Sequence, residues 1–325
     1  MTLPRNKAIQ QINFWIKTSE PFLFISDFKC EKNILLPLEK VNPEEILFEI
    51  NGNRNFEEPQ PSNREFELIK QPISYALFKQ QFDKVHNELM IGNSYLTNLT
   101  FPTPIQSNHS LKEIFYRSSA KYKLWIKNEF VVFSPEIFLQ LNGNKMSSFP
   151  MKGTIDAAQE DAESAILSNT KEMAEHVSIV DLIRNDMSIH ASEVKVKRFR
   201  YIDKINTHEK KLLQVSSEIS GTLTDYGKEN FGEVLFSLLP AGSISGAPKH
   251  KTLEIIKAVE NYDRGYYSGV FGIFDGKTFD SGVMIRFIEQ LGDQLIFKSG
   301  GGIHSLSDPK SEYEEMIDKV YVPIY

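Results

Sequence analysis

The spacing of hydrophobic residues changes several times along the chain, and each change marks an expected element. Between residues 75 and 91, apolar residues recur at i, i+4 and i+7, which predicts a helix. From residue 121 the period becomes two in KLWIKNEFVVF and EIFLQLNGNKM, which predicts strands. Within the second of these segments, Asn142-Gly143 predicts a hairpin turn.

The second half of the chain alternates between the same two patterns. Residues 162–189 carry a helical stripe, residues 194–202 alternate as a strand, and another helix follows Pro248. The segment 267–303 predicts three or four strands, and the last helix begins after Asp308 as its N-cap. Because the strand connections are short, we expect an α+β fold in which helices pack outside antiparallel sheet.

Composition and charge narrow the class of protein. The chain has 325 residues, of which 41% are hydrophobic and 25% charged, so an ordinary globular core is expected. Its net charge of −6 argues against nucleic acid or an anionic membrane as the main partner. No run approaches 18 uncharged apolar residues, and charges interrupt the first apolar stretch, so we expect a cytoplasmic protein without a membrane segment. The single cysteine, Cys30, excludes an internal disulfide and a cysteine-cluster metal site, and a buried inert thiol is favoured over a nucleophile.

Two Glu-x-x-Glu pairs are the first candidates for chemistry. Glu172 and Glu175 lie in one predicted helix, and Glu312 and Glu315 lie in another. The i, i+3 spacing places both carboxylates of a pair on one helical face. Two such helices together would offer four hard oxygen ligands, which suits Mg²⁺ with an anionic substrate. A solvated charged face remains the alternative for either pair alone.

Two glycine-rich stretches and two cations are further candidates. The segments 242–246 and 300–302 precede helices, so their N–H groups could hold an anion, although tight-turn geometry alone also explains them. Lys152 leaves a predicted strand, where desolvation would make it a nucleophile; a surface lysine is the alternative. Arg286 lies among apolar neighbours in VMIRF and is expected mid-strand, facing a carboxylate.

Taken together, these segments resemble the chorismate-utilising enzymes. The matching strings follow the family's order over residues 75–320: FSPEIFL, PMKGT, KEMAEHVSIVDLIRND, SSEISGTL, LLPAGSISGAPK, RGYYSG, VMIRF, GGGI and SEYEEMIDK. The resemblance implies a Mg²⁺ enzyme with two facing antiparallel sheets and outer helices. It also implies one chorismate-binding domain over residues 1–325, with residues 1–74 as a shortened N-terminal lobe and 75–325 as the motif-bearing core.

Within the family, Lys152 favours one branch. Anthranilate, isochorismate and salicylate synthases usually carry alanine at this position, whereas lysine is typical of aminodeoxychorismate synthase component I. Isochorismate and salicylate synthases activate water with a lysine whose matching position here is Leu96. The resemblance therefore implies amination of chorismate to 4-amino-4-deoxychorismate for 4-aminobenzoate and folate synthesis. Anthranilate synthase component I is the alternative, and a non-catalytic chorismate-binding subunit is the alternative from another class.

The resemblance also implies a role for each site residue. Lys152 would attack C2 of chorismate while Glu136 protonates the leaving hydroxyl at C4, and ammonia would then enter at C4 and expel the lysine. Mg²⁺ would be held by Glu175, Glu312 and Glu315. The remaining expected substrate contacts are Gly153, Thr154, Gln214, Ser245, Gly246, Tyr267, Arg286, Gly300, Gly301, Gly302 and Lys319.

Two features concern the source of ammonia and a departure from the family. Gln214 stands where the family usually has a histidine, so it can hydrogen bond but cannot transfer a proton. The only cysteine, Cys30, lies outside any glutaminase motif. Ammonia is therefore expected from solution or from a separate glutamine amidotransferase partner.

Overall fold

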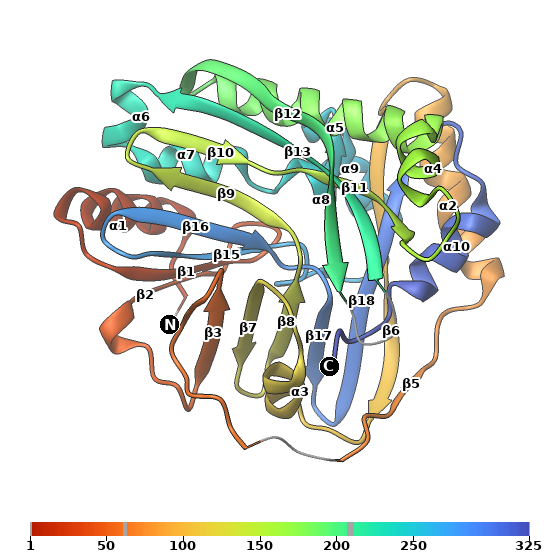
Figure 1. The fold of residues 1–325 in the computed structure, drawn as a ribbon, viewed down its shortest axis with the longest axis horizontal. Coiled ribbons are helices and arrows are strands. Elements are labelled where there is room, and N and C mark those ends of the chain that lie inside the picture. The colour runs from red at the N-terminus through yellow and green to blue at the C-terminus, as the bar shows by residue number, and fades with distance from the viewer. Residues whose placement is uncertain (1, 61–63, 207–210, 325) are drawn as a thin grey trace.

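Two antiparallel sheets face each other in the computed structural model, which describes residues 2–60, 64–206 and 211–324 (Figure 1). The first sheet runs in the order β11 (Met151–Asp156), β13 (Lys211–Leu223), β10 (Lys145–Ser148), β9 (Ile137–Asn142), β16 (Thr278–Val283), β15 (Val270–Phe274), β1 (Phe22–Ser26) and β2 (Asn33–Pro37), and β12 (Ala191–Asn206) pairs with β13.

The second sheet has the same number of strands. Its order is β14 (Gly246–Ala247), β6 (Leu96–Ser107), β18 (Gln294–Ile303), β17 (Phe287–Leu291), β8 (Phe130–Ser134), β7 (Tyr122–Ile126), β3 (Ile46–Ile50) and β4 (Asn53–Arg54), and β5 (Leu68–Lys70) pairs with β6. Residues 1–74 thus supply strands to both sheets.

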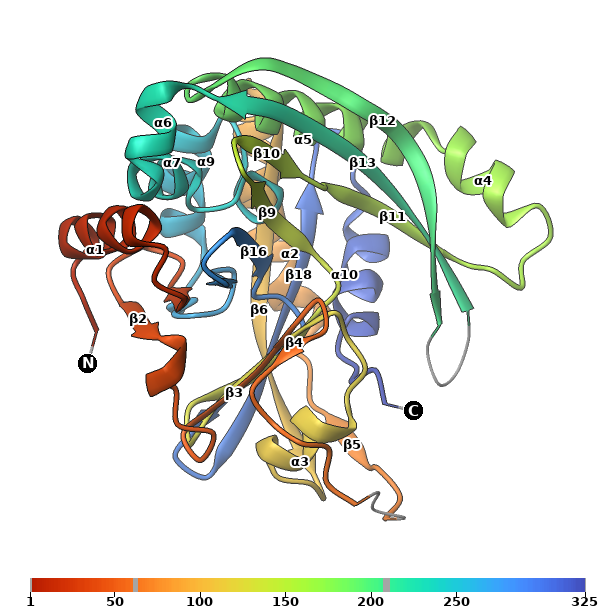
Figure 2. The same cartoon turned by 60° about the vertical axis from the view of Figure 1, so that its left-hand side comes forward.

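Helices cover the outer faces of the two sheets (Figures 1 and 2). Those associated with the first sheet are α1 (Arg5–Thr18), α4 (Ala162–Ser168), α5 (Thr170–Ser188), α6 (Asp225–Glu229) and α7 (Phe231–Leu238), whereas α8 (Gly242–Ser245) lies between α5 and α9 and contacts β6 and β14 of the second sheet. Those associated with the second are α2 (Tyr75–Met90), α3 (Leu111–Arg117), α9 (Lys249–Val259) and α10 (Pro309–Asp318), and a short 3₁₀ turn, η1 (Leu38–Lys40), follows β2. α5 packs against β11, β12 and β13, and α10 packs against β18.

Alternation along β1 shows how the layers are formed. Phe22 and Phe24 join the core beneath the outer helices of the first sheet, whereas Leu23 and Ile25 join the core between the two sheets. Because successive side chains of a strand point to opposite faces, a strand that is apolar at every position is buried on both sides. The predicted α+β class with facing sheets and outer helices is confirmed.

Several element predictions need correction. The helical pattern over 162–189 is two helices, because Asn169 leaves the helical conformation and caps α5 with its side chain on the Glu172 N–H. The helix α1 was missed because few of its residues are fully buried; Ala8 and Ile12 are the ones that are.

Candidate functional site

Lys152 occupies the outermost strand of the first sheet and reaches a buried carboxylate. It lies on β11, its side chain is 15% exposed, and its Nζ is 3.9 Å from Glu175 Oε2 on α5. Glu175 is itself 8% exposed. The predicted nucleophile therefore lies in a largely closed site beside a predicted metal ligand, and is not an isolated surface lysine.

His304 is a third member of this group that sequence reasoning missed. Its Nε2 lies 3.2 Å from Glu175 Oε1, and its Nδ1 accepts the Leu306 N–H at 3.0 Å. A nitrogen that accepts a backbone N–H carries no proton, so in the neutral ring the proton is on Nε2, toward the carboxylate. The available signal was its position directly after the GGGI string.

The triple glycine lies inside β18, which corrects the expectation of a loop before a helix. Gly300, Gly301 and Gly302 pair in register with Thr100, Leu99 and Asn98 of β6. Glycine is needed in this strand because neighbouring side chains approach its backbone closely. A Cβ on Gly302 would fall 3.3 Å from both Lys152 Nζ and Glu175 Oε2. The glycines therefore leave space for the charged side chains around them.

The second glutamate pair borders the neighbouring glycine. A Cβ on Gly301 would lie 3.4 Å from Glu312 Oε2 and 3.6 Å from Glu315 Oε1. Glu312 is buried on α10 and accepts a hydrogen bond from Ser307. Lys319 follows α10, and its Nζ pairs with Glu315 at 2.6 Å and donates to the Gly300 carbonyl at 2.9 Å. The predicted lysine and the two glutamates of α10 are thus brought together.

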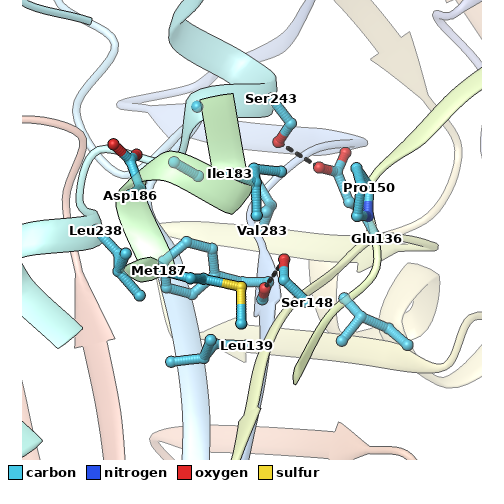
Figure 3. Close-up of a pocket in the computed structure, with 14 residues that line it drawn as sticks. Glu136, Leu139, Ser148, Pro150, Ile183, Asp186, Met187, Leu238, Ser243 and Val283 are labelled. Carbon is cyan, nitrogen blue, oxygen red and sulfur yellow. Dashed lines mark hydrogen bonds between the residues drawn. The ribbon is translucent and has the colours of Figure 1, made fainter. Parts of the chain in front are cut away.

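Glu136, the predicted acid, is buried in the link between β8 and β9. Ser243 of α8 donates a hydrogen bond to its Oε1 (Figure 3). Burial raises the pKa of Glu136, while the Ser243 hydrogen bond and then the positive charge of Lys152 oppose that rise. A carboxyl group whose pKa is raised by burial holds its proton to higher pH, which suits it to giving a proton to a leaving group. Sequence reasoning did not single out Ser243 as its partner.

Arg286 lies at a crossing between the sheets, not in the middle of a strand as predicted. The chain leaves β16 of the first sheet at Val283 and enters β17 of the second at Phe287, and Arg286 turns there with φ of 54°. Its guanidinium stacks over the Tyr321 ring at 5.1 Å, and its Nε is buried without a hydrogen-bond acceptor. A buried donor of this kind is suited to an incoming carboxylate.

The other predicted contacts are placed as follows. Tyr267 is buried, and burial raises its pKa to about 12, so its hydroxyl stays protonated. Thr154 is exposed and pairs with Gln214 between β11 and β13. Ser245 is fully buried and donates its hydroxyl to the Ala241 carbonyl. Ser245 is therefore engaged in its own helix.

The two remaining glycines allow close approaches. Gly153 has φ of 84°, and a Cβ there would fall 3.1 Å from Glu172 Oε2. Gly246 has φ of 129°, and a Cβ there would fall 2.0 Å from the Leu96 carbonyl oxygen. Gly246 thus permits β14 to pair with β6.

The carboxylates fit a hard divalent cation by chemistry. Among the described ranges, no three His, Cys, Asp or Glu side chains form a ready metal cluster. Glu175 and Glu312 are nevertheless buried oxygen donors, and with Glu315 they border adjacent glycines whose missing side chains leave room beside them. Oxygen donors of this type suit Mg²⁺ with several retained waters.

Comparison with known sequences now gives the family. A sequence profile for the family described as chorismate binding enzyme matches residues 25–324. The chain belongs to this chorismate-binding enzyme family. That membership confirms the predicted family, and with it chorismate as the ligand class.

Relatives within the family differ in their names. The chain is 50% identical over 317 residues to an uncharacterised PabA-like protein of Haemophilus influenzae, with 97% of this chain and 96% of that protein covered. A PabA-like protein of Pasteurella multocida is 48% identical, with 97% and 98% covered. Aminodeoxychorismate synthase component 1 of Bacillus subtilis is 29% identical over 77% of this chain and 55% of its own length.

Solved structures of this family share the fold. A 2,3-dihydroxybenzoate-specific isochorismate synthase from Bacillus anthracis superposes with a TM-score of 0.74 at 18% identity, covering 98% of this chain and 89% of that one. Anthranilate synthase component I from Streptococcus pneumoniae gives 0.66 at 21% identity, covering 78% and 58%. In the described part of this chorismate-binding chain, no helix is long and apolar enough to cross a membrane.

Proposed function

We propose that this chorismate-binding enzyme aminates chorismate to 4-amino-4-deoxychorismate, as aminodeoxychorismate synthase component I does. The observation that carries the proposal is the position of Lys152. Its amine lies in a largely closed site, beside the Glu175 carboxylate and the position that a Cβ of Gly302 would occupy. Its positive charge acts to lower the pKa of the nearby Glu136 carboxyl group. A lysine and a protonated acid in one site can replace a ring hydroxyl in two displacement steps.

In the first step, the neutral Lys152 amine bonds to C2 of chorismate and the ring double bonds shift. The C4 hydroxyl takes the proton of Glu136 and leaves as water. In the second step, ammonia bonds to C4, the double bonds shift back, and the C2–Lys152 bond breaks. The proton that the new amino group loses returns to the Glu136 carboxylate, so both residues end as they began.

Charged groups around these two residues would hold the substrate. The guanidinium of Arg286, whose Nε is buried, and the hydroxyl of Tyr267 are proposed to bind the enolpyruvyl carboxylate, and Lys319 to bind a second charged oxygen. When bound by Glu175, Glu312 and Glu315, Mg²⁺ would neutralise the ring carboxylate and the charge that develops there.

A product assay tests the proposal. Chorismate, Mg²⁺ and ammonium are incubated with the protein at about pH 8.5, and products are identified by mass spectrometry with and without an aminodeoxychorismate lyase. We expect 4-aminobenzoate when the lyase is added and none without it. Anthranilate and pyruvate without the lyase would assign the chain to the anthranilate branch instead.

Two lysine variants test the mechanism. Lys152→Ala should lower the amination rate by two orders of magnitude or more, on the scale of covalent catalysis lost with its nucleophile. Lys277→Ala, in a surface turn between β15 and β16, is the matched control and should keep the wild-type rate. An unchanged rate for Lys152→Ala would exclude the lysine mechanism.

The proposed source of ammonia is a separate glutamine amidotransferase. This partner should raise the rate with glutamine and leave the rate with ammonium salts unchanged. Size-exclusion chromatography of the two purified proteins, with and without chorismate, tests their association.

A further inference from the structure

A narrow cavity adjoins Glu136 on the side of helices α5 and α8 (Figure 3). It lies between β9 of the first sheet and these two helices, and its free space of about 20 Å³ holds one molecule of the size of water. Apart from Glu136, its walls include Leu139, Ile183, Met187 and Ala241.

Polar groups are placed at the two ends of this cavity. At the inner end lies the Glu136 carboxyl group with Ser243, whose hydroxyl donates to it. At the other end lies Asp186 (Figure 3). Its side chain is 20% exposed and pairs with Lys249 at 2.6 Å. Between them, Met187 is buried and Ile183 is half-buried, and the hydroxyl of Ser148, which also lines the cavity, donates to the Phe138 carbonyl (Figure 3). The cavity thus extends from the partly exposed ion pair of Asp186 and Lys249 to the predicted catalytic acid.

We propose that this cavity is the ammonia-binding site of the enzyme. The inference rests on the proposed amination. The cavity admits a molecule of one heavy atom and excludes larger amines, and its mostly apolar walls favour neutral ammonia over hydrated ammonium.

The chemistry of the second displacement requires ammonia at this place. The nitrogen lone pair forms the bond to C4 while the bond between C2 and Lys152 breaks, and one proton of the new ammonium group passes to the carboxylate of Glu136. Glu136 has become that carboxylate by giving its proton to the departing hydroxyl. A nucleophile that approaches along Glu136 therefore reaches C4 beside the base that it needs.

Narrowing the cavity tests the proposal through the two substrates separately. Ala241→Val adds two methyl groups at the wall, and Ala8→Val adds the same groups in the same core but away from the cavity. We expect Ala241→Val to raise KM for ammonia at least tenfold and to leave KM for chorismate within twofold. Ala8→Val should change neither. An unchanged KM for ammonia in Ala241→Val, or equal changes for both substrates, would overturn the proposal.

Widening the cavity gives an independent result with a gain of activity. Ile183→Ala should accept methylamine and release the N-methyl product at least ten times faster than wild type, because its wall recedes by three carbon atoms. Val180→Ala, on the same helix but outside the cavity wall, is the control and should reject methylamine. Equal methylamine use by wild type, Ile183→Ala and Val180→Ala would also overturn the ammonia site.

The two proposals fail in different ways. A wild-type protein that forms no amino product at any ammonium concentration would overturn the proposed function and this site with it. A wild-type protein that aminates chorismate while both cavity variants behave like their controls would overturn the site alone. If Ala241→Val does not fold by circular dichroism, the Ile183→Ala comparison decides.

Discussion

Replacing His176 with phenylalanine should remove one source of the acid sensitivity of this fold. His176 follows Glu175 on α5 and has no exposed surface. Its Nε2 lies 2.6 Å from Ser217 Oγ on β13, and its Nδ1 is buried without a partner. Burial lowers the pKa of His176 from its ordinary value of 6.5 to about 4. The folded protein therefore keeps this ring neutral where the unfolded chain would protonate it.

The size of the effect follows from proton linkage. A group whose folded pKa is lowered contributes stability above its unfolded pKa and loses it as the pH falls toward the folded value. With pKa values of about 4 and 6.5, one histidine changes the free energy of unfolding by about 2 kcal/mol between pH 8 and pH 5. The His176→Phe variant lacks this change, whatever constant offset its larger ring introduces.

Urea unfolding of both proteins at pH 5, 6, 7 and 8 measures the difference. The stability of wild type relative to His176→Phe should fall by about 2 kcal/mol from pH 8 to pH 5. His250→Phe is the matched control, because His250 lies on the exposed surface of α9 and its replacement should give a smaller dependence. A relative stability of His176→Phe that stays constant within about 0.5 kcal/mol, a quarter of the linkage value, would refute the reasoning.

Three further changes probe the site itself. Gly302→Ala should lower activity about tenfold and the melting temperature by only a few degrees, because the new Cβ would lie 3.3 Å from Lys152 Nζ and Glu175 Oε2. Steady-state kinetics and thermal melting measure the two effects. Full activity of the variant would contradict the close packing of these side chains against Gly302. Burial raises the pKa of Glu136, so its contribution to stability is present below about pH 4.5 and is lost as the pH rises through the folded pKa. Glu136→Gln should therefore gain stability relative to wild type from pH 5 to pH 8, with exposed Glu57→Gln as control, and a flat difference in urea unfolding would argue against a raised pKa. Glu315→Gln should weaken Mn²⁺ binding 10- to 100-fold by titration calorimetry, a readout independent of turnover, and wild-type affinity would remove Glu315 from the proposed metal ligands.

Periodicity predicted the strands within residues 121–146, 194–202 and 267–303 and the helices α2, α4, α5, α9 and α10, because their burial is regular. It did not predict the other helices α1, α3, α6, α7 and α8 or the early strands β1 to β6. It did not predict the break at Asn169, since the apolar stripe continues on both sides and the interruption is a capping hydrogen bond from one side chain. Arg286 was placed in a strand because its neighbours are apolar, yet those neighbours belong to a crossing between two sheets. A local pattern carries no information about which sheet the next strand joins.

The site itself was predictable only as a set of residues. The family motifs indicated Lys152 and the glutamates, but their contacts depend on strands far apart in sequence. Ser243 donates a hydrogen bond to Glu136, and His304 lies in close contact with Glu175. Neither interaction follows from a periodic pattern or a fixed spacing in the sequence. The distances between these side chains therefore follow only from the folded chain.

The distribution of the amino-terminal strands has a consequence for how the molecule can be divided. β1 pairs with both β2 and β15, and β3 pairs with both β4 and β7, so strands of the early segment form hydrogen-bonded pairs with later strands in each sheet. A chain starting at residue 75 would expose the edges of β15 and β7, whose unpaired backbone groups favour aggregation. The family motifs of residues 75–320 therefore depend on the strands of residues 22–54 for their sheet edges, and we expect a chain that lacks those strands to lose solubility although it keeps every proposed site residue.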